Sequence, residues 1–150
     1  MGTPIKGVFL QNLAFDLLVA MELYGVISDF SDVVMRRLGC TPGFITMNHS
    51  MAVSVLCDKV GLENPWVCAN YNKSGFRMNP SQDNCEASFA MGRSKNIAMS
   101  VFASGNLTPS DGLDYVVSRM NGGGVDAILF GSSNAVNIEK NMRKINSGIS

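Results

Sequence analysis

The chain is poor in charge, and it holds neither a basic tract nor a long apolar run. Charged residues make up 16% of its 150 residues, against about a quarter in a typical domain. The formal net charge is zero, so the sequence predicts no nucleic-acid partner. No apolar run approaches the roughly 18 residues of a membrane span, so no membrane partner is expected. A low charge density instead fits a protein that hides much of its surface, in its core or against a partner.

Ligands for a metal ion are also scarce. His49 is the only histidine, and the four cysteines, at positions 40, 57, 68 and 85, form no Cys-x-x-Cys pair. A zinc site takes about four nitrogen or sulfur ligands at closer spacing, so we expect no metal and reduced thiols. The N-terminus also lacks the charged, apolar and small-residue order of a signal peptide. The sequence therefore predicts a cytoplasmic protein.

The chain does contain five apolar runs that each stop at asparagine, followed each time by a polar loop and a stretch with helical spacing. This order predicts one α/β domain over residues 1–150, made of five βα units with a parallel sheet. The carboxyl ends of parallel strands share one rim, and ligands bind there. The expected strands are 5–11, 44–47, 66–71, 97–103 and 125–130.

Capping signals predict where several helices begin and end. A break near Gly25 and an N-cap at Ser31 predict two helices after the first strand, the second ending at Gly39. Residues 41–43, Thr-Pro-Gly, predict a turn. The other signals are an N-cap at Ser81 for a helix over 81–92, Thr108 with Pro109 as a helix start, and a last helix over about 135–146.

Two architectures fit five consecutive βα units. They make a complete flavodoxin-like doubly wound sheet, or five-eighths of a TIM barrel, whose full length is around 250 residues. A doubly wound sheet binds its ligand at one switch point, whereas here every strand ends in polar residues. This pattern favours a partial TIM barrel, with the flavodoxin-like sheet as the alternative.

Three stretches carry a resemblance to a known family. They are Phe44-Ile45-Thr46-Met47-Asn48-His49-Ser50, then Phe102-Ala103-Ser104-Gly105-Asn106-Leu107, and Phe130-Gly131-Ser132-Ser133-Asn134 followed by Glu139-Lys140-Asn141. They resemble the fifth, seventh and eighth strands of the aldo-keto reductases, and the resemblance spans about residues 44–146. Residues 72–81 also resemble a stretch shared by a group of uncharacterised prokaryotic TIM-barrel proteins.

The resemblance implies a TIM barrel and NADP as cofactor. It places Asn48 at the nicotinamide carboxamide and Phe102 against the nicotinamide ring, with Ser104 and Gly105 in the following loop. It also implies that Lys140 and Asn141 contact the adenosine part of the cofactor. If the resemblance is set aside, Lys140 and Asn141 would form a solvated helix face and Phe102 would be a core residue.

The family's catalytic Asp, Tyr and Lys lie on earlier strands than those matched here. Gln11 takes the position of the family's histidine, and an amide does not titrate near neutrality. We therefore expect either the C-terminal portion of a longer barrel or a barrel relative with other chemistry. A barrel without its first strands has two open edges, which predict a homo-oligomer or association through the sheet edges.

The residues themselves predict a phosphate site at Gly131-Ser132-Ser133-Asn134. Small residues between a buried strand and a helix leave backbone N–H groups and the helix dipole free to meet an anion. Alternatively, Ser133 or Asn134 only caps the helix.

Acid–base and substrate-binding candidates are few. His49 has an unperturbed pKa near neutrality, which makes it, with Gln11, the catalytic candidate; a structural role is the alternative. Lys73 and Arg77 in the long loop 72–81 are placed to clamp an anionic substrate, or are plain surface charges. Asn12 and Asn72, which follow two of the expected strands, are the other predicted substrate-binding residues.

The leading hypothesis is thus the C-terminal part of an aldo-keto-reductase-like barrel that binds a phosphorylated ligand, such as NADP, at its rim. One alternative is a barrel-derived binding or interaction module without catalysis. Another is a complete flavodoxin-like domain that binds a phosphate-bearing ligand.

Overall fold

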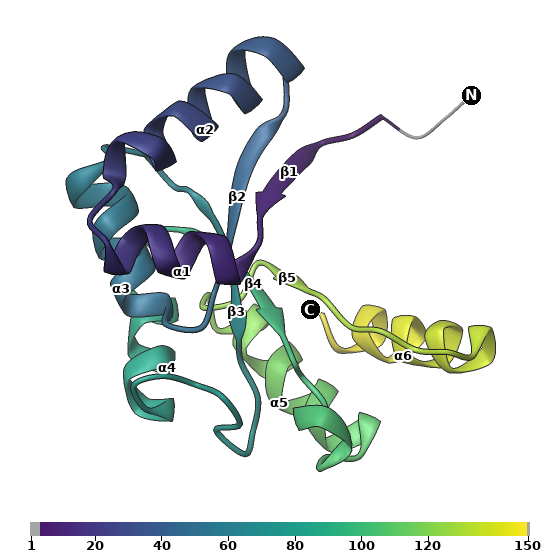
Figure 1. Ribbon diagram of the computed structural model, residues 1–150. Helices are drawn as coiled ribbons and strands as arrows, with labels where there is room; N and C mark the ends of the chain where they lie inside the picture. Colours follow the sequence, from purple (N-terminus) through teal and green to yellow (C-terminus); the bar gives the residue numbers. More distant parts are fainter. Residues whose placement is uncertain (1–3, 150) are drawn as a thin grey trace.

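The computed structural model describes residues 4–149 and consists of one sheet with its connecting helices (Figure 1). The strands are β1 (Gly7–Leu10), β2 (Thr41–Thr46), β3 (Trp66–Asn70), β4 (Lys95–Met99) and β5 (Ala127–Ile128). The helices are α1 (Asn12–Ala20), α2 (Tyr24–Leu38), α3 (His49–Ser54), α4 (Gln82–Ala90), α5 (Pro109–Asn121) and α6 (Ala135–Gly148), with a π-helical turn, η1 (Val55–Lys59), and a 3-10 turn, η2 (Ala103–Gly105). No helix in the described part is long and apolar enough to cross a membrane.

All five strands are parallel and lie in chain order, β1-β2-β3-β4-β5. The predicted α/β class with a parallel sheet is therefore confirmed. A flavodoxin-like sheet has the order 2-1-3-4-5, because its chain reverses direction across the sheet at a switch point. The described strands show no such reversal, and their order is that of consecutive strands in a TIM barrel.

The main core lies between the sheet and the helices α1 to α5, of which α1 to α4 run along one side of the sheet in Figure 1. Phe44 of β2 is fully buried, and its ring centroid lies 5.1 Å from that of Phe15 and 5.8 Å from that of Phe30. Val67 of β3 pairs with Phe44 in register and is buried in the same cluster. Alternate residues of each strand therefore hold the helices in place.

The other face of the sheet carries apolar side chains that belong to none of the core clusters. Phe9, Ile45, Trp66, Ile97 and Met99 are each partly exposed, and the Phe9 and Trp66 rings lie 6.2 Å apart. In a closed barrel, positions of this kind point into the interior. Among the described strands, β1 and β5 each have one unpaired edge, and the predicted association through these edges stays a prediction.

The turn predicted at residues 41–43 is wrong, because these residues open strand β2. Thr41 N–H donates to Lys6 O on the β1 side. The nitrogen of Pro42 then points to the opposite side of β2, toward β3. Because β3 pairs with β2 only from Gly43 onward, no strand accepts a hydrogen bond at Pro42, and the missing N–H of proline costs no bond of the sheet.

Three other predicted boundaries differ from the structure. Ser31 does not cap a helix: it is buried within α2, and its hydroxyl donates to Ile27 O at 2.9 Å. The fourth strand is Lys95–Met99 rather than 97–103, because the backbone turns at Ser100, with a φ of 55°. The fifth is only Ala127–Ile128. Residues placed at strand ends by sequence are therefore partly in loops.

Candidate functional site

A two-lobed cleft lies beyond the carboxyl ends of β4 and β5. Lobe 1 has a volume of about 500 Å³ and lobe 2 of about 560 Å³, and they share Phe102 and Gly131. The other residues lining lobe 1 are Thr108, Pro109, Ser110, Ser132, Asn137, Lys140, Asn141 and Lys144. The other residues lining lobe 2 are Phe76, Arg77, Met99, Ser100, Val101, Ser104, Gly105, Leu129 and Phe130. The cleft therefore occupies the rim at which α/β proteins bind ligands.

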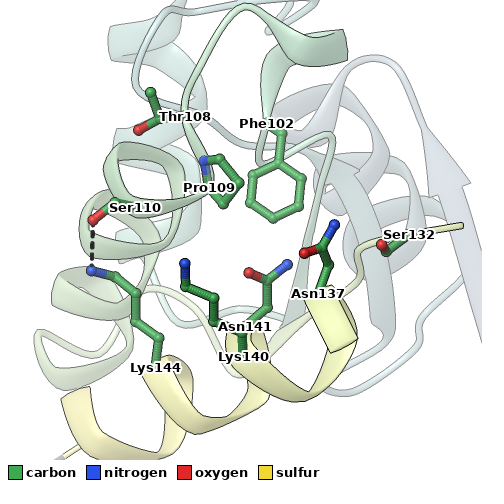
Figure 2. Close-up of a pocket in the computed structure, with 10 residues that line it drawn as sticks. Phe102, Thr108, Pro109, Ser110, Ser132, Asn137, Lys140, Asn141 and Lys144 are labelled. Carbon is green, nitrogen blue, oxygen red and sulfur yellow. Dashed lines mark hydrogen bonds between the residues drawn. The ribbon is translucent and has the colours of Figure 1, made fainter. Parts of the chain in front are cut away.

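One wall of lobe 1 is a polar face of α6. Asn137, Lys140, Asn141 and Lys144 follow each other at the three- and four-residue spacing that places side chains on one side of a helix. In Figure 2 these side chains project from α6 toward Phe102 and the start of α5. Lobe 1 is therefore lined by amide and ammonium groups on one side.

Asn141 is buried except where its amide opens into lobe 1. The residue is only 6% exposed, and its side-chain amide borders lobe 1 and forms no hydrogen bond with any residue from 4 to 149. No buried side-chain nitrogen or oxygen atom among these residues lacks a partner, so the Asn141 amide atoms are reached by solvent through the lobe. The amide is therefore placed to bond something that enters the lobe.

The two lysines of lobe 1 differ in their surroundings. Lys144 Nζ lies 2.8 Å from Asp114 Oδ1 and donates to Ser110 Oγ at 2.8 Å, so its charge is already compensated. Lys140 forms no ion pair within the described part of the chain. Lys140 is therefore the cation that lobe 1 offers to a ligand.

The start of α5 forms the opposite wall. Thr108 is the N-cap, and its hydroxyl accepts from Asp111 N–H at 3.1 Å, while Pro109 occupies the first turn. Both residues line lobe 1, so the positive end of the α5 dipole lies beside the lysines. The carboxylate of Asp111 lies in the same first turn and offsets part of this dipole, so the lysines of α6 supply most of the preference of lobe 1 for negative charge.

Lobe 2 combines aromatic and aliphatic side chains with two serines, Ser100 and Ser104, and one cation. Phe76, Phe102 and Phe130 line it, and the Phe102 and Phe130 rings lie 6.0 Å apart in an edge-to-face arrangement. Arg77 supplies the cation, with its guanidinium carbon 5.1 Å from the centre of the Phe76 ring. The lobe thus combines flat apolar walls with a single guanidinium group.

The backbone around lobe 2 is strained. Six described non-glycine residues have a positive φ. Three of them line lobe 2, namely Arg77, Ser100 and Ser104, and a fourth, Ala103, directly precedes Ser104. A left-handed conformation costs such a residue about 1–2 kcal/mol. Strain of this kind is concentrated at functional sites in proteins. Its position here supports the assignment of the cleft as the functional site.

The structure brings half of the sequence-predicted site residues together in this cleft. They are Phe102, Ser104, Gly105, Gly131, Ser132, Lys140, Asn141 and Arg77. Sequence reasoning missed Asn137 and Lys144, although their spacing from Lys140 and Asn141 on a predicted helix was a usable signal. It also missed the α5 wall, because Thr108 and Pro109 were interpreted only as a helix start.

Three predicted residues are helix caps instead. Gln11 Oε1 accepts from Leu13 N–H at 3.0 Å, Asn48 Oδ1 from Met51 N–H at 3.2 Å, and Asn134 Oδ1 from Val136 N–H at 2.9 Å. Asn134 therefore takes the capping role that was the alternative to phosphate binding, and exposed Ser133 beside it lines neither lobe. Asn12 is the first residue of α1 and also lies outside the cleft.

Two loop residues support the cleft without lining it. Asn72 is fully buried, its Oδ1 accepts from Phe76 N–H at 2.8 Å, and its Nδ2 donates to Phe76 O at 2.9 Å. Lys73 lies 3.7 Å from Asp111 at the start of α5. Asn72 thus fixes the loop that presents Phe76 and Arg77, while Lys73 links this loop to α5.

His49 lies in the core, away from the cleft. It is fully buried, with Nδ1 2.8 Å from Ser88 Oγ and Nε2 2.9 Å from Asn96 Oδ1. Burial lowers the pKa of His49 to about 4, because its effect is larger than that of the hydrogen bond to Asn96 Oδ1, which raises the pKa. A neutral imidazole sealed from solvent with both nitrogens engaged cannot meet a substrate at the rim. Its placement argues against the predicted acid–base role.

No protein-family model, curated protein or solved structure matches this chain. Among residues 4–149, no group of three or more histidine, cysteine or acidic side chains is placed to hold a metal ion.

Proposed function

We propose that the cleft binds a phosphorylated small molecule, with the phosphate in lobe 1; NADP is one candidate. The observation that carries the proposal is the pairing of two groups in lobe 1: the Asn141 amide, which opens into the lobe and bonds no residue from 4 to 149, and Lys140, which forms no ion pair within those residues. A phosphate accepts hydrogen bonds from both groups, and its charge is favoured by the α5 dipole.

The proposal is for binding rather than for proton transfer. The titratable side chains lining the two lobes are Lys140, Lys144 and Arg77, all of them cations at neutral pH. Cations of this kind hold anionic groups. The position beyond two neighbouring parallel strands also agrees with the place where barrels commonly bind phosphate.

The test is a titration of the isotopically labelled protein with inorganic phosphate, glucose 6-phosphate and NADPH, followed by NMR. We expect at least one ligand to shift the amide signals of residues 131–144. Lys140→Met and Asn141→Leu should each weaken that binding at least tenfold. Lys59→Met is the matched control, because Lys59 is an exposed lysine that lines neither lobe.

The outcomes separate clearly. Equal weakening by the Lys59 control would show only a long-range charge effect and would count against a site at lobe 1. The absence of signal shifts with all three ligands would overturn the proposed function.

A further inference from the structure

We propose that the ligand carries a second anionic group, a carboxylate, which pairs with Arg77 in lobe 2 while an apolar ring spans the cleft between the two charges. This inference rests on the proposed function, because it takes the phosphate to be in lobe 1. It adds a second recognition site and limits the chemical class of the ligand.

Arg77 is a cation that lacks an acidic partner. It forms no ion pair within residues 4–149, and its only ring contact is with Phe76. A guanidinium group presents its donors in a fixed planar fork that matches the two oxygens of a carboxylate. The group is therefore suited to an anion that the chain itself does not supply.

The backbone at Arg77 is held in place by buried amides. Its carbonyl oxygen accepts from Asn70 Nδ2 at 3.1 Å, and Asn70 is only 3% exposed. Asn72 binds the N–H and the carbonyl of the preceding residue, Phe76. These contacts maintain a left-handed φ of 55° at Arg77. The loop is thus built to present this one side chain at lobe 2.

Apolar side chains form much of the lining between the two charges. Phe102 lines both lobes, and Phe130, Met99 and Leu129 continue its surface within lobe 2. Flat rings pack well against such walls, and volumes of about 500 and 560 Å³ are of the size that small ligands occupy. Two cationic ends with an apolar middle match a ligand that is anionic at both ends.

The test compares ligands that differ only in the second anion. Phenyl phosphate is paired with 4-carboxyphenyl phosphate, and biphenyl-4-yl phosphate with its 4′-carboxy derivative, so that two spans are covered. Dissociation constants are measured by NMR titration for the unmodified protein, Arg77→Met, Arg77→Lys and Lys140→Met. Lys59→Met again serves as the control for an exposed charge outside the cleft.

We expect the carboxylated member of at least one pair to bind the unmodified protein tenfold or more tightly than its partner. Arg77→Met should abolish this preference, so that the two members of each pair bind with affinities within about twofold of each other. Arg77→Lys should keep only part of the preference, because an ammonium group cannot form the bidentate contact. Lys140→Met should weaken all four compounds.

The two proposals fail in different ways. Binding that weakens in Lys140→Met without any preference for the carboxylated compounds would overturn the role of Arg77 and leave phosphate binding intact. A preference that survives in Arg77→Met would also overturn it. If none of the four compounds binds the unmodified protein, this inference falls, and the titration with inorganic phosphate, glucose 6-phosphate and NADPH decides separately on the proposed function.

Discussion

Lys144 Nζ lies 2.8 Å from Ser110 Oγ, and this hydrogen bond joins the two helices on either side of lobe 1 (Figure 2). The same ammonium group lies 2.8 Å from Asp114 Oδ1, also on α5. Below it, Ile145 of α6 packs against Leu113 and Val117 of α5. The α6 wall is therefore attached to α5 by a small apolar cluster, by the two contacts of Lys144 at the lobe end, and by a hydrogen bond from Asn121 Nδ2 to Gly148 O at 2.7 Å at the other end.

Lys144→Met should loosen α6 without unfolding the protein. The side chains of Lys144 and Asp114 are 35% and 65% exposed, and a pair of this kind contributes at most about 1 kcal/mol to the free energy of unfolding. Hydrogen exchange should accelerate over residues 135–148 while the midpoint of urea unfolding changes little. Arg143→Met is the control, because Arg143 pairs with Glu139 within α6 alone; equal acceleration in that variant would refute the role of Lys144 as a link.

Asn141→Leu should change the free energy of unfolding by less than about 1 kcal/mol. The substitution replaces an amide that opens into lobe 1 and bonds no residue from 4 to 149 with an apolar side chain of similar size. Urea unfolding at neutral pH measures the change. A clear loss of stability would mean that the amide is satisfied within the folded chain, and this would remove the main support for a ligand in lobe 1.

The stability of the protein should fall as the pH decreases from about 6.5 to 4, in part because of His49. The pKa of His49 is lowered to about 4 by burial, against about 6.5 in an unfolded chain. Between these values the unfolded chain binds the proton and the folded protein does not, so acid favours unfolding. From pH 7 to pH 5 this one residue should reduce the free energy of unfolding by about 2 kcal/mol.

Comparison with His49→Gln isolates this contribution. Glutamine can still hydrogen-bond in the core but does not titrate, so the variant should lose less stability over the same pH interval. Carboxylates titrate equally in both proteins and cancel in the difference. Identical pH dependence of the two unfolding curves would contradict the assignment of His49 as a neutral core residue.

Two helical glycines should respond in opposite directions to alanine. A Cβ on Gly112 would lie 2.5 Å from Val101 O and 3.0 Å from Phe102 Cδ1, whereas a Cβ on Gly25 would meet nothing within 4 Å. Gly112→Ala should cost about 1–3 kcal/mol, because the carbonyl cannot move away without shifting the rim of the cleft. Gly25→Ala should stabilise α2 by up to about 1 kcal/mol. The midpoints of thermal unfolding of both variants measure these changes. An unchanged midpoint in Gly112→Ala would show that α5 is free to shift.

Local signals in the sequence were reliable where the structure uses contacts within a few residues. Ser81 and Thr108 cap helices as predicted, and α2 ends at Gly39 in a left-handed conformation. An N-cap side chain stands at the open start of a helix and accepts from the backbone N–H two or three residues ahead. Ser31 does not stand at a helix start, because the apolar face of α2 continues through its position and buries it. A hydroxyl group alone does not distinguish the two situations.

The sequence by itself determined the alternation of strands and helices and the collection of polar residues beyond the strands, because both follow from hydrophobic periodicity and from local backbone preferences. It also indicated Gly131, Ser132, Lys140 and Asn141. Only the tertiary structure decided that Asn134 caps a helix while Asn141 faces a cavity, and that His49 is sealed in the core. Burial and cavities arise from packing between residues far apart in the chain, such as Phe102, Ser110 and Lys144, and no local pattern specifies which side chains that packing leaves without a partner.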